Sequence, residues 1–222
     1  DTIRSYAAPR RLAVIVEGLE IRQQDRLIER RGPATKAAFD ASGQSTKALQ
    51  GFARSCGVEV DALETMETDK GAWLVFKQQQ SGAETSSLIG DILQKSLQGL
   101  PIPKRMRWGD LPGEFVRPVH WIVMLFGDKV IPSTIMGVKS GAVSFGHRFH
   151  HPGKITIGKA SEYEALMLKP GHVIADFTKR RELIRHAILR EGEKLNADTV
   201  VDESLLDEVT GLVEYPVALT GQ

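Results

Sequence analysis

The stretch VHWIVMLFGDKVIPSTI, residues 119–135, decides the fold class of this chain. It contains two runs rich in β-branched and large apolar residues, 119–126 and 130–135, and the Gly-Asp pair between them is a typical turn signal. A third strand-like run follows at residues 143–149. Because strands joined by short turns pair in an antiparallel arrangement, this part of the chain is predicted to form a partly antiparallel sheet.

The residues before this stretch mix strand and helix patterns. Residues 12–16 are a continuous apolar run typical of a buried strand, and residues 73–77 predict another strand. Turn and capping residues delimit a pair of helices at about 34–57. Apolar residues spaced by three and four predict a further helix over 88–97.

Two more helices are predicted toward the end of the chain, one opening near Thr178 and a shorter one around residues 205–209. The whole pattern predicts an α+β fold with two lobes of mixed, partly antiparallel sheet and packed helices. The expected lobes are residues 1–105, which include the helical pair, and residues 106–222, which are expected to be truncated at the C-terminus.

The composition is that of a globular protein. Of the 222 residues, 41% are hydrophobic, which is enough to bury a core. The 29 Lys and Arg residues nearly balance the 28 Asp and Glu residues, and the formal net charge of +1 does not draw the whole surface onto nucleic acid. Contact with RNA must therefore come from local patches.

Three further features bear on the setting of the protein. Its single cysteine, Cys56, cannot form an internal disulfide, which fits a reducing cytosol. No apolar run reaches the roughly 18 residues that a membrane-spanning helix requires. The chain opens at Asp1 without a signal-like segment and stops soon after the apolar run 217–219, so both ends are expected to be cuts in a longer protein. The sequence thus predicts a soluble, cytoplasmic protein without a membrane partner.

The first candidate for function is a basic cluster. Lys104, Arg105 and Arg107 place three cations close together, and Trp108 follows directly. The cations can meet phosphates while the indole ring stacks on a base or a ribose. The alternative is a connector between the lobes whose basic side chains face water. The residues alone leave both interpretations open.

The second candidate is the sequence GHRFHHP, which holds three imidazoles, His147, His150 and His151, and imidazole is a common zinc ligand. A structural zinc site, however, needs four ligands, usually with thiolates, and the chain has one cysteine. If the strand continues through this sequence, His147 and Phe149 share one face, and Arg148 and His150 share the other. We therefore expect surface histidines first, RNA contact second and no metal.

The third candidate is the predicted helix with Lys179, Arg180, Arg181 and Arg185, which could follow a phosphate backbone. Interspersed glutamates favour a solvated helix face instead. Common signatures of enzymes are missing from the sequence, which holds no G-x-x-x-x-G-K-[ST] loop, no G-x-S-x-G turn and no H-E-x-x-H helix. No catalytic residue is therefore assigned.

Several stretches, spread in order over nearly the whole chain, resemble one known family. They are residues 9–14 (PRRLAV), 32–40, 51–55, 100–109 (LPIPKRMRWG), 115–121 (FVRPVHW), 146–149 (GHRF) and 205–219. Together they resemble the beta subunit of bacterial glycyl-tRNA synthetase, and the two stretches 100–109 and 115–121 are the most specific. Two departures are Ser45, where the family has Pro, and Tyr215, where Trp is frequent.

The resemblance implies a cytoplasmic α2β2 enzyme that joins glycine to tRNA(Gly). In that family the alpha subunit holds the site for ATP, used with Mg, and for glycine, so this chain is expected to bind no cofactor and to be noncatalytic. The beta subunit engages tRNA, with its anticodon-binding region beyond Gln222. The implied partners are the alpha subunit, a second beta subunit and tRNA(Gly). We expect the chain to scaffold alpha and to position tRNA, with Lys104, Arg105, Arg107 and Arg148 facing the RNA.

One alternative function follows from a more distant resemblance, to a domain of the phenylalanyl-tRNA synthetase beta chain that removes wrongly attached amino acids. A pocket rejects a substrate lacking one methylene by only about 1–3 kcal/mol, which is why some synthetases edit. Glycine has no smaller amino-acid competitor, so editing is poorly motivated here. The alternative is a metal-dependent or editing-type hydrolase that uses His147, His150 and His151.

Overall fold

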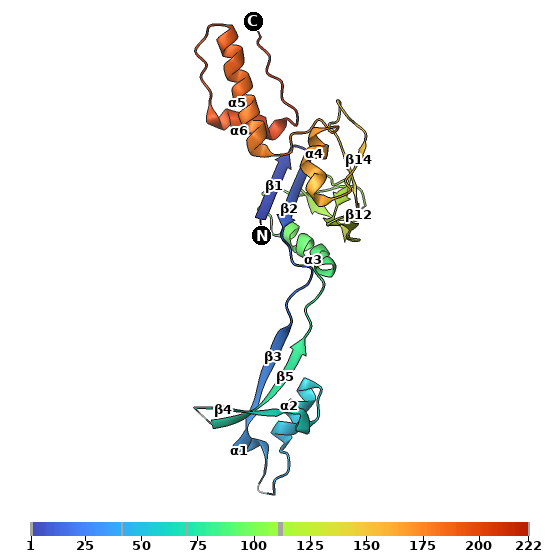
Figure 1. Ribbon diagram of the computed structural model, residues 1–222, viewed down its shortest axis with the longest axis vertical. Helices are drawn as coiled ribbons and strands as arrows, with labels where there is room; N and C mark the ends of the chain where they lie inside the picture. The colour runs from blue at the N-terminus through green and yellow to red at the C-terminus, as the bar shows by residue number, and fades with distance from the viewer. Residues whose placement is uncertain (1, 41, 70, 111–112, 222) are drawn as a thin grey trace. The chain divides into compact units, whose positions relative to one another are not determined.

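The computed structural model describes residues 2–40, 42–69, 71–110 and 113–221. The chain divides into two compact units, a larger one of Asp1–Glu20 with Ser86–Gln222 and a smaller one of Ile21–Thr85 (Figure 1). Both combine helices with small, mainly antiparallel sheets, which confirms the predicted α+β class. The larger unit includes residue 105, where the sequence predicts a boundary between lobes. It also includes the first twenty residues, whose Tyr6 and Ile15 share a core with late parts of the chain.

The smaller unit is a three-stranded antiparallel sheet with the order β3-β5-β4 and a predicted helical pair beside it. Its elements are β3 (Arg26–Ala34), α1 (Thr35–Ala38), α2 (Lys47–Cys56), a 3-10 turn (Val60–Ala62), β4 (Glu64–Thr68) and β5 (Gly71–Gln80). The helix α2 begins where the Thr46 side chain accepts a hydrogen bond from the backbone of Leu49, and it ends at Gly57, whose φ of 73° suits glycine. Ala38, Leu49 and Leu74 form the core of this unit.

The larger unit opens with an antiparallel hairpin of β1 (Thr2–Ala8) and β2 (Arg11–Glu17). The strand predicted at residues 12–16 is confirmed, but it is not buried on both faces. Ile15 packs into a core with Tyr6 and Met167, whereas Leu12 and Val14 on the opposite face are 56% and 60% exposed. Because successive side chains of a strand point to opposite faces, the apolar residues on the second face of this hairpin stay exposed.

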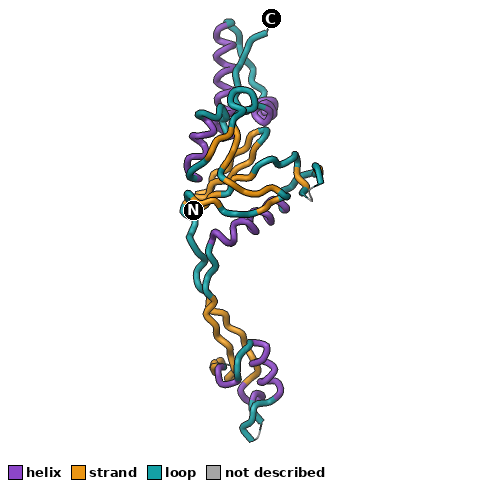
Figure 2. The backbone as a smooth tube through the Cα atoms, turned by 90° about the vertical axis from the view of Figure 1, so that its right-hand side faces the viewer, coloured by secondary structure: helices purple, strands orange, loops and turns teal. Residues whose placement is uncertain are grey.

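The middle of the larger unit consists of α3 and a set of very short strands (Figure 2). They are α3 (Thr85–Gln98), β6 (Met106–Arg107), β7 (Glu114–Phe115), β8 (Ile122–Val123), β9 (Leu125–Phe126), β10 (Lys129–Val130), β11 (Thr134–Ile135), β12 (Val138–Gly141), β13 (Val143–Phe145) and β14 (Lys154–Thr156). The strands β9 and β10 pair across the predicted Gly-Asp turn, and β12 pairs in parallel with β8. A second core of Met124, Ile131 and Ile135 packs against apolar residues of α3.

The three strand-like runs of this region are less regular in the structure than predicted. The run 119–126 is not strand before Ile122 and is interrupted at Met124, and the run 130–135 is strand only at its two ends, in β10 and β11. The run 143–149 ends as strand at Phe145. This last difference changes the interpretation of the histidines that follow, because the chain enters a turn at residues 148–150.

The remaining elements of the larger unit are helical. They are a 3-10 turn (Ala160–Glu162), α4 (Tyr163–Leu168), α5 (Phe177–Lys194) and α6 (Glu203–Leu212). The side chains of Asp176 and Asp202 accept backbone N–H groups at the starts of α5 and α6. Among the described residues, no helix is both long and apolar enough to cross a membrane.

Candidate functional site

A buried ion pair joins the beginning of β2 to the segment that follows α6. The Arg11 Nε donates to Glu214 Oε1 at 2.9 Å and its Nη2 to Glu214 Oε2 at 3.3 Å. Both side chains are only 5% exposed. Two parallel N–H···O bonds fix the planes of both groups as well as their separation. Parts of the chain about two hundred residues apart are therefore held in one geometry.

The same guanidinium reaches a third part of the chain. Its Nη1 donates to the carbonyl oxygen of Phe145 at 2.7 Å, at the end of β13. The backbone of Glu214 in turn accepts from the N–H of Ile174 at 2.9 Å. The guanidinium of Arg11 thus fastens the loops after β13 and after α6 to each other, and the backbone of Glu214 adds the loop after α4. We call Arg11 and Glu214 the anchor pair.

A second buried arginine, Arg180, holds neighbouring parts of the chain together. Arg180, in α5, is fully buried and donates to the carbonyl oxygens of Ala7 at 2.7 Å, Ile174 at 2.5 Å and Thr210 at 3.1 Å. Burial lowers the pKa of Arg180, while nearby Glu214 acts in the opposite direction. This arginine ties α5 to the β1 end of the hairpin and to α6.

Five aromatic or imidazole rings lie on the three anchored loops. They are His147, Phe149, His150, His172 and Tyr215, and we call them the ring face. The ring centroids of His147 and His150 are 4.5 Å apart, and Tyr215 lies 5.9 Å from His150 and 5.4 Å from His172. Most of these side chains are exposed, with Phe149 at 80% and Tyr215 at 39%.

A tight turn after β13 brings two of the predicted imidazoles together. Gly146 is buried, and a Cβ there would lie 2.4 Å from the carbonyl oxygen of His151. The N–H of His147 donates to Gly171 O at 2.7 Å, and its ring Nδ1 accepts from the N–H groups of Phe149 and His150, each at 3.2 Å. The expected alternation of His147 and His150 across a strand is therefore wrong, because the strand has already ended.

The acceptor role of Nδ1 has consequences for protonation. It requires the neutral ring with the proton on Nε2. Burial, followed by the charge of His150, lowers the pKa of His147 below its ordinary value of 6.5. The turn therefore keeps its acceptor at neutral pH.

We expect the stability of the larger unit to fall as the pH drops below about 6.5, because the unfolded state then binds a proton at His147 that the folded state does not. The loss should stop once the pH is below the depressed folded pKa. Thermal unfolding followed by tryptophan fluorescence between about pH 5 and about pH 8 measures it. The variant His147→Asn, which keeps an acceptor but does not titrate, should show a weaker pH dependence. The matched control is His186→Asn on α5, and an equal change in both variants would contradict the assignment to His147.

The predicted RNA-facing cations have different surroundings. Lys104 is exposed. The Arg105 Nη2 donates to Gln98 O at 2.9 Å at the C-terminal end of α3, where a cation also suits the helix dipole. Arg107 lies opposite Glu114 in the β6–β7 pair, with Nε 2.6 Å from Glu114 Oε1. The positive charge of the cluster is therefore smaller than the sequence indicates.

Arg148, the fourth predicted RNA-facing residue, belongs to the ring-bearing loop. It is exposed, and its guanidinium carbon lies 5.9 Å from the centre of the Phe149 ring. The structure thus places this cation beside the exposed ring of Phe149.

The basic run of α5 is matched by acidic residues of α6. Arg181 pairs with Glu203 and Asp207, both at 2.5 Å, and Arg185 also pairs with Glu203 at 2.5 Å. The hydrogen bonds from Arg185 and Arg181 lower the pKa of Glu203 to about 2. The geometry agrees with a solvated helix face for these two arginines, whereas Arg180 of the same run points into the protein.

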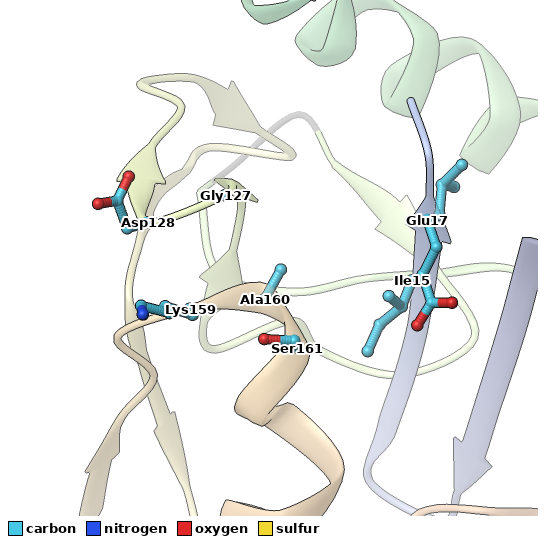
Figure 3. A pocket seen from close by; sticks show the side chains of 8 residues that line it. Ile15, Glu17, Gly127, Asp128, Lys159, Ala160 and Ser161 are labelled. Carbon is cyan, nitrogen blue, oxygen red and sulfur yellow. The ribbon is translucent and has the colours of Figure 1, made fainter. Parts of the chain in front are cut away.

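An open hollow of about 380 Å³ lies apart from these groups, between β2, the β9–β10 turn and the 3-10 turn at Ala160–Glu162 (Figure 3). Ile15 and Glu17 line it from β2, and Asp128 and Lys159 lie on the opposite side. None of the predicted RNA-facing residues lines it. Within the described parts of the chain, no group of three or more His, Cys, Asp or Glu side chains is placed to hold a metal ion.

Sequence reasoning missed the anchor pair, the buried role of Arg180, and His172. The anchor residues are about two hundred positions apart, and no spacing rule connects them. The local sequence shows only that Arg11 directly precedes the apolar run 12–16.

Comparison with known proteins gives a consistent result. A family model described as "Glycyl-tRNA synthetase beta subunit" matches residues 1–222. The chain is 54% identical over 217 residues to the glycine–tRNA ligase beta subunit of Hahella chejuensis, covering 98% of this chain and 31% of that protein. It is 55% identical, with the same coverage, to the beta subunit of Chromohalobacter salexigens, and 47% identical over 221 residues to that of Coxiella burnetii. The chain spans about a third of the length of these relatives.

Proposed function

Because the chain belongs to the glycyl-tRNA synthetase beta-subunit family, we propose that it is a region of a beta subunit that supports ATP-dependent attachment of glycine to tRNA(Gly). Its part in this reaction is to scaffold the alpha subunit and to position tRNA. The observation that carries the proposal is the family match along the whole chain, with relatives about 50% identical over nearly all of it.

The chemistry of the reaction is proposed to lie elsewhere in the assembly. The sequence holds no recognisable nucleotide-binding motif, and the hollow beside β2 presents one Lys and two carboxylates on an open surface. We therefore assign ATP with Mg, and glycine, to the alpha subunit of a cytoplasmic α2β2 enzyme. The chain itself is assigned no cofactor and no catalytic residue.

The cations of residues 104–107 remain our candidates for contact with the RNA backbone. Lys104 is exposed, and the Arg107–Glu114 pair is largely exposed as well, so its strength is small and a phosphate can displace the carboxylate. Arg105 keeps its charge although it caps α3. Such contacts position a nucleic acid without reading its sequence.

The hydrolase alternative has no comparable support. Of its three imidazoles, only His147 and His150 belong to the ring face, and His151 contributes a backbone N–H to the turn. No acidic or thiol side chain joins them in a metal-holding group among the residues that the structure describes.

The test replaces Lys104, Arg105 and Arg107 by Ala in a complete beta subunit assembled with alpha. We expect weaker binding of tRNAs in general. The slope of log affinity against log salt should become shallower by about 1–2, because binding with fewer phosphate contacts releases fewer counterions. The measurement is tRNA affinity across a salt series.

Two controls make this test specific. Lys139→Ala removes an exposed cation from β12 in the same unit and should leave the slope unchanged. Arg105→Ala alone separates loss of the α3 cap, read out as thermal stability, from loss of an RNA contact. An unchanged affinity and slope in the assembled triple variant would make the cluster a solvated connector.

A further inference from the structure

The ring face combines exposure with an unusual density of flat side chains. Phe149 is 80% exposed, Tyr215 is 39% exposed, and His150 and His172 are exposed as well. Exposed aromatic side chains that gather on one surface mark interaction sites more often than scattered ones do. The cluster is drawn from three separate loops, so it results from the fold and not from a local repeat in the sequence.

We propose that the ring face is a stacking site for unpaired nucleotides of tRNA, an inference that rests on the proposed tRNA-positioning function. Every base has a flat π surface, so a set of exposed rings binds single-stranded RNA without demanding a sequence. Base-paired RNA keeps its bases stacked within the helix and offers the rings only sugars and phosphates.

The mutual geometry of the rings leaves faces for a ligand. His147 and His150 are inclined at 33°, and Tyr215 meets His150 and His172 edge-on, at 61° and 77°. In each of the two pairs with Tyr215, one ring meets the other with its edge, so the faces of that ring are not covered by this contact. Ring faces are thus available to bases entering from solvent.

Charge favours RNA over an apolar protein surface. Arg148 lies beside the Phe149 ring, and Lys169 is exposed just ahead of His172. Glu214, the carboxylate next to Tyr215, is buried and paired with Arg11, so it offers no free negative charge to a phosphate. An apolar partner would have to strip water from the imidazole nitrogens and from these cations at a cost.

The rings are also held in place before any ligand arrives. The anchor pair fixes the chain on either side of the cluster, at Phe145 and at Glu214, and the His147 N–H binds Gly171 O next to His172. His172 itself adopts a φ of 52°, an uncommon value for a residue other than glycine. Preorganised side chains lose little freedom on binding, so more of the stacking energy appears as affinity.

The test uses a complete beta subunit, assembled with alpha, that carries Phe149→Ala or Tyr215→Ala. Three probes are compared: tRNA(Gly), a single-stranded RNA of about ten nucleotides, and a blunt RNA duplex of the same sequence. We expect each variant to bind the single strand and the tRNA about tenfold more weakly, with an unchanged salt slope and unchanged binding of the duplex. Phe149→Tyr and Tyr215→Trp, which keep a ring, should retain most of the affinity.

Matched controls keep the outcomes distinct. Phe39→Ala removes a ring of the smaller unit that is 38% exposed, close to the exposure of Tyr215, and should change nothing. Phe149 is so exposed that its removal leaves the fold intact, which guards against a variant that misfolds. Unchanged binding of the single strand and the tRNA in both Ala variants overturns the proposal. If RNA binding is unchanged in both Ala variants but the variant at Lys104, Arg105 and Arg107 binds tRNA more weakly, the stacking proposal is wrong and the positioning function stands. If that variant also binds normally, the basic cluster fails as an RNA contact as well.

Discussion

Replacing Arg180 by Met should lower the free energy of unfolding of the larger unit by about 3–5 kcal/mol. The side chain is completely buried, and its three short hydrogen bonds go to carbonyl oxygens on β1, on the loop before α5 and on α6. Methionine matches the apolar stem but leaves these buried carbonyls without a donor, at about 1–3 kcal/mol for each group that water cannot reach. The relief of the desolvation of the arginine charge offsets part of this cost.

Urea unfolding followed by tryptophan fluorescence measures the loss, in a Trp73→Phe background so that the remaining Trp108 and Trp121 report only on the larger unit. The control is Arg181→Met, one position further along α5, whose guanidinium pairs with carboxylates at the surface. Its removal should cost far less. Equal losses for the two variants would show that the buried carbonyl contacts of Arg180 contribute little.

The helices of this protein follow from local sequence. The spacing of apolar residues predicts α2, α3, α5 and α6, and their starts are marked by residues such as Thr46 and Asp202 whose side chains cap them. Apolar spacing and capping both involve residues within one or two helical turns of each other, so the local sequence is enough to predict these helices. The α+β class and the Gly-Asp hairpin turn of β9 and β10 were predictable for the same reason.

The ring face was only partly predictable, because long-range contacts determine it. The sequence shows His147 and His150 near each other, but a strand pattern over residues 143–149 separates them, and the buried Gly146 that ends the strand gives no sign of its close approach to His151 O. His172 and Tyr215 join the cluster through the anchor pair. Similarly, Arg180 stands in a charged run, and only tertiary packing distinguishes it from Arg181.

Breaking the anchor pair from one side should be nearly as damaging as the loss of Arg180. Glu214→Leu leaves the guanidinium of Arg11 buried without its carboxylate, and truncating one partner of a buried pair costs about 3–5 kcal/mol. The double variant Arg11→Met with Glu214→Leu removes both charges and fills the space with apolar atoms. We expect it to be more stable than Glu214→Leu alone, because no unpaired charge remains. Urea unfolding of the four members of the cycle gives the coupling energy between the two residues.

The double variant also separates stability from the geometry of the ring face. Arg11→Met removes the donor to Phe145 O, so the loop that bears His147 loses one of its fastenings even where the apolar replacement restores the free energy of unfolding. If the anchor pair positions the rings, this variant should recover stability but not the affinity of the assembled enzyme for single-stranded RNA. The matched comparison is Arg4→Met with Glu17→Leu, which removes an exposed ion pair of the same hairpin and should leave both quantities nearly unchanged. Recovery of both stability and RNA affinity in the anchor double variant would show that apolar packing alone holds the loops in place.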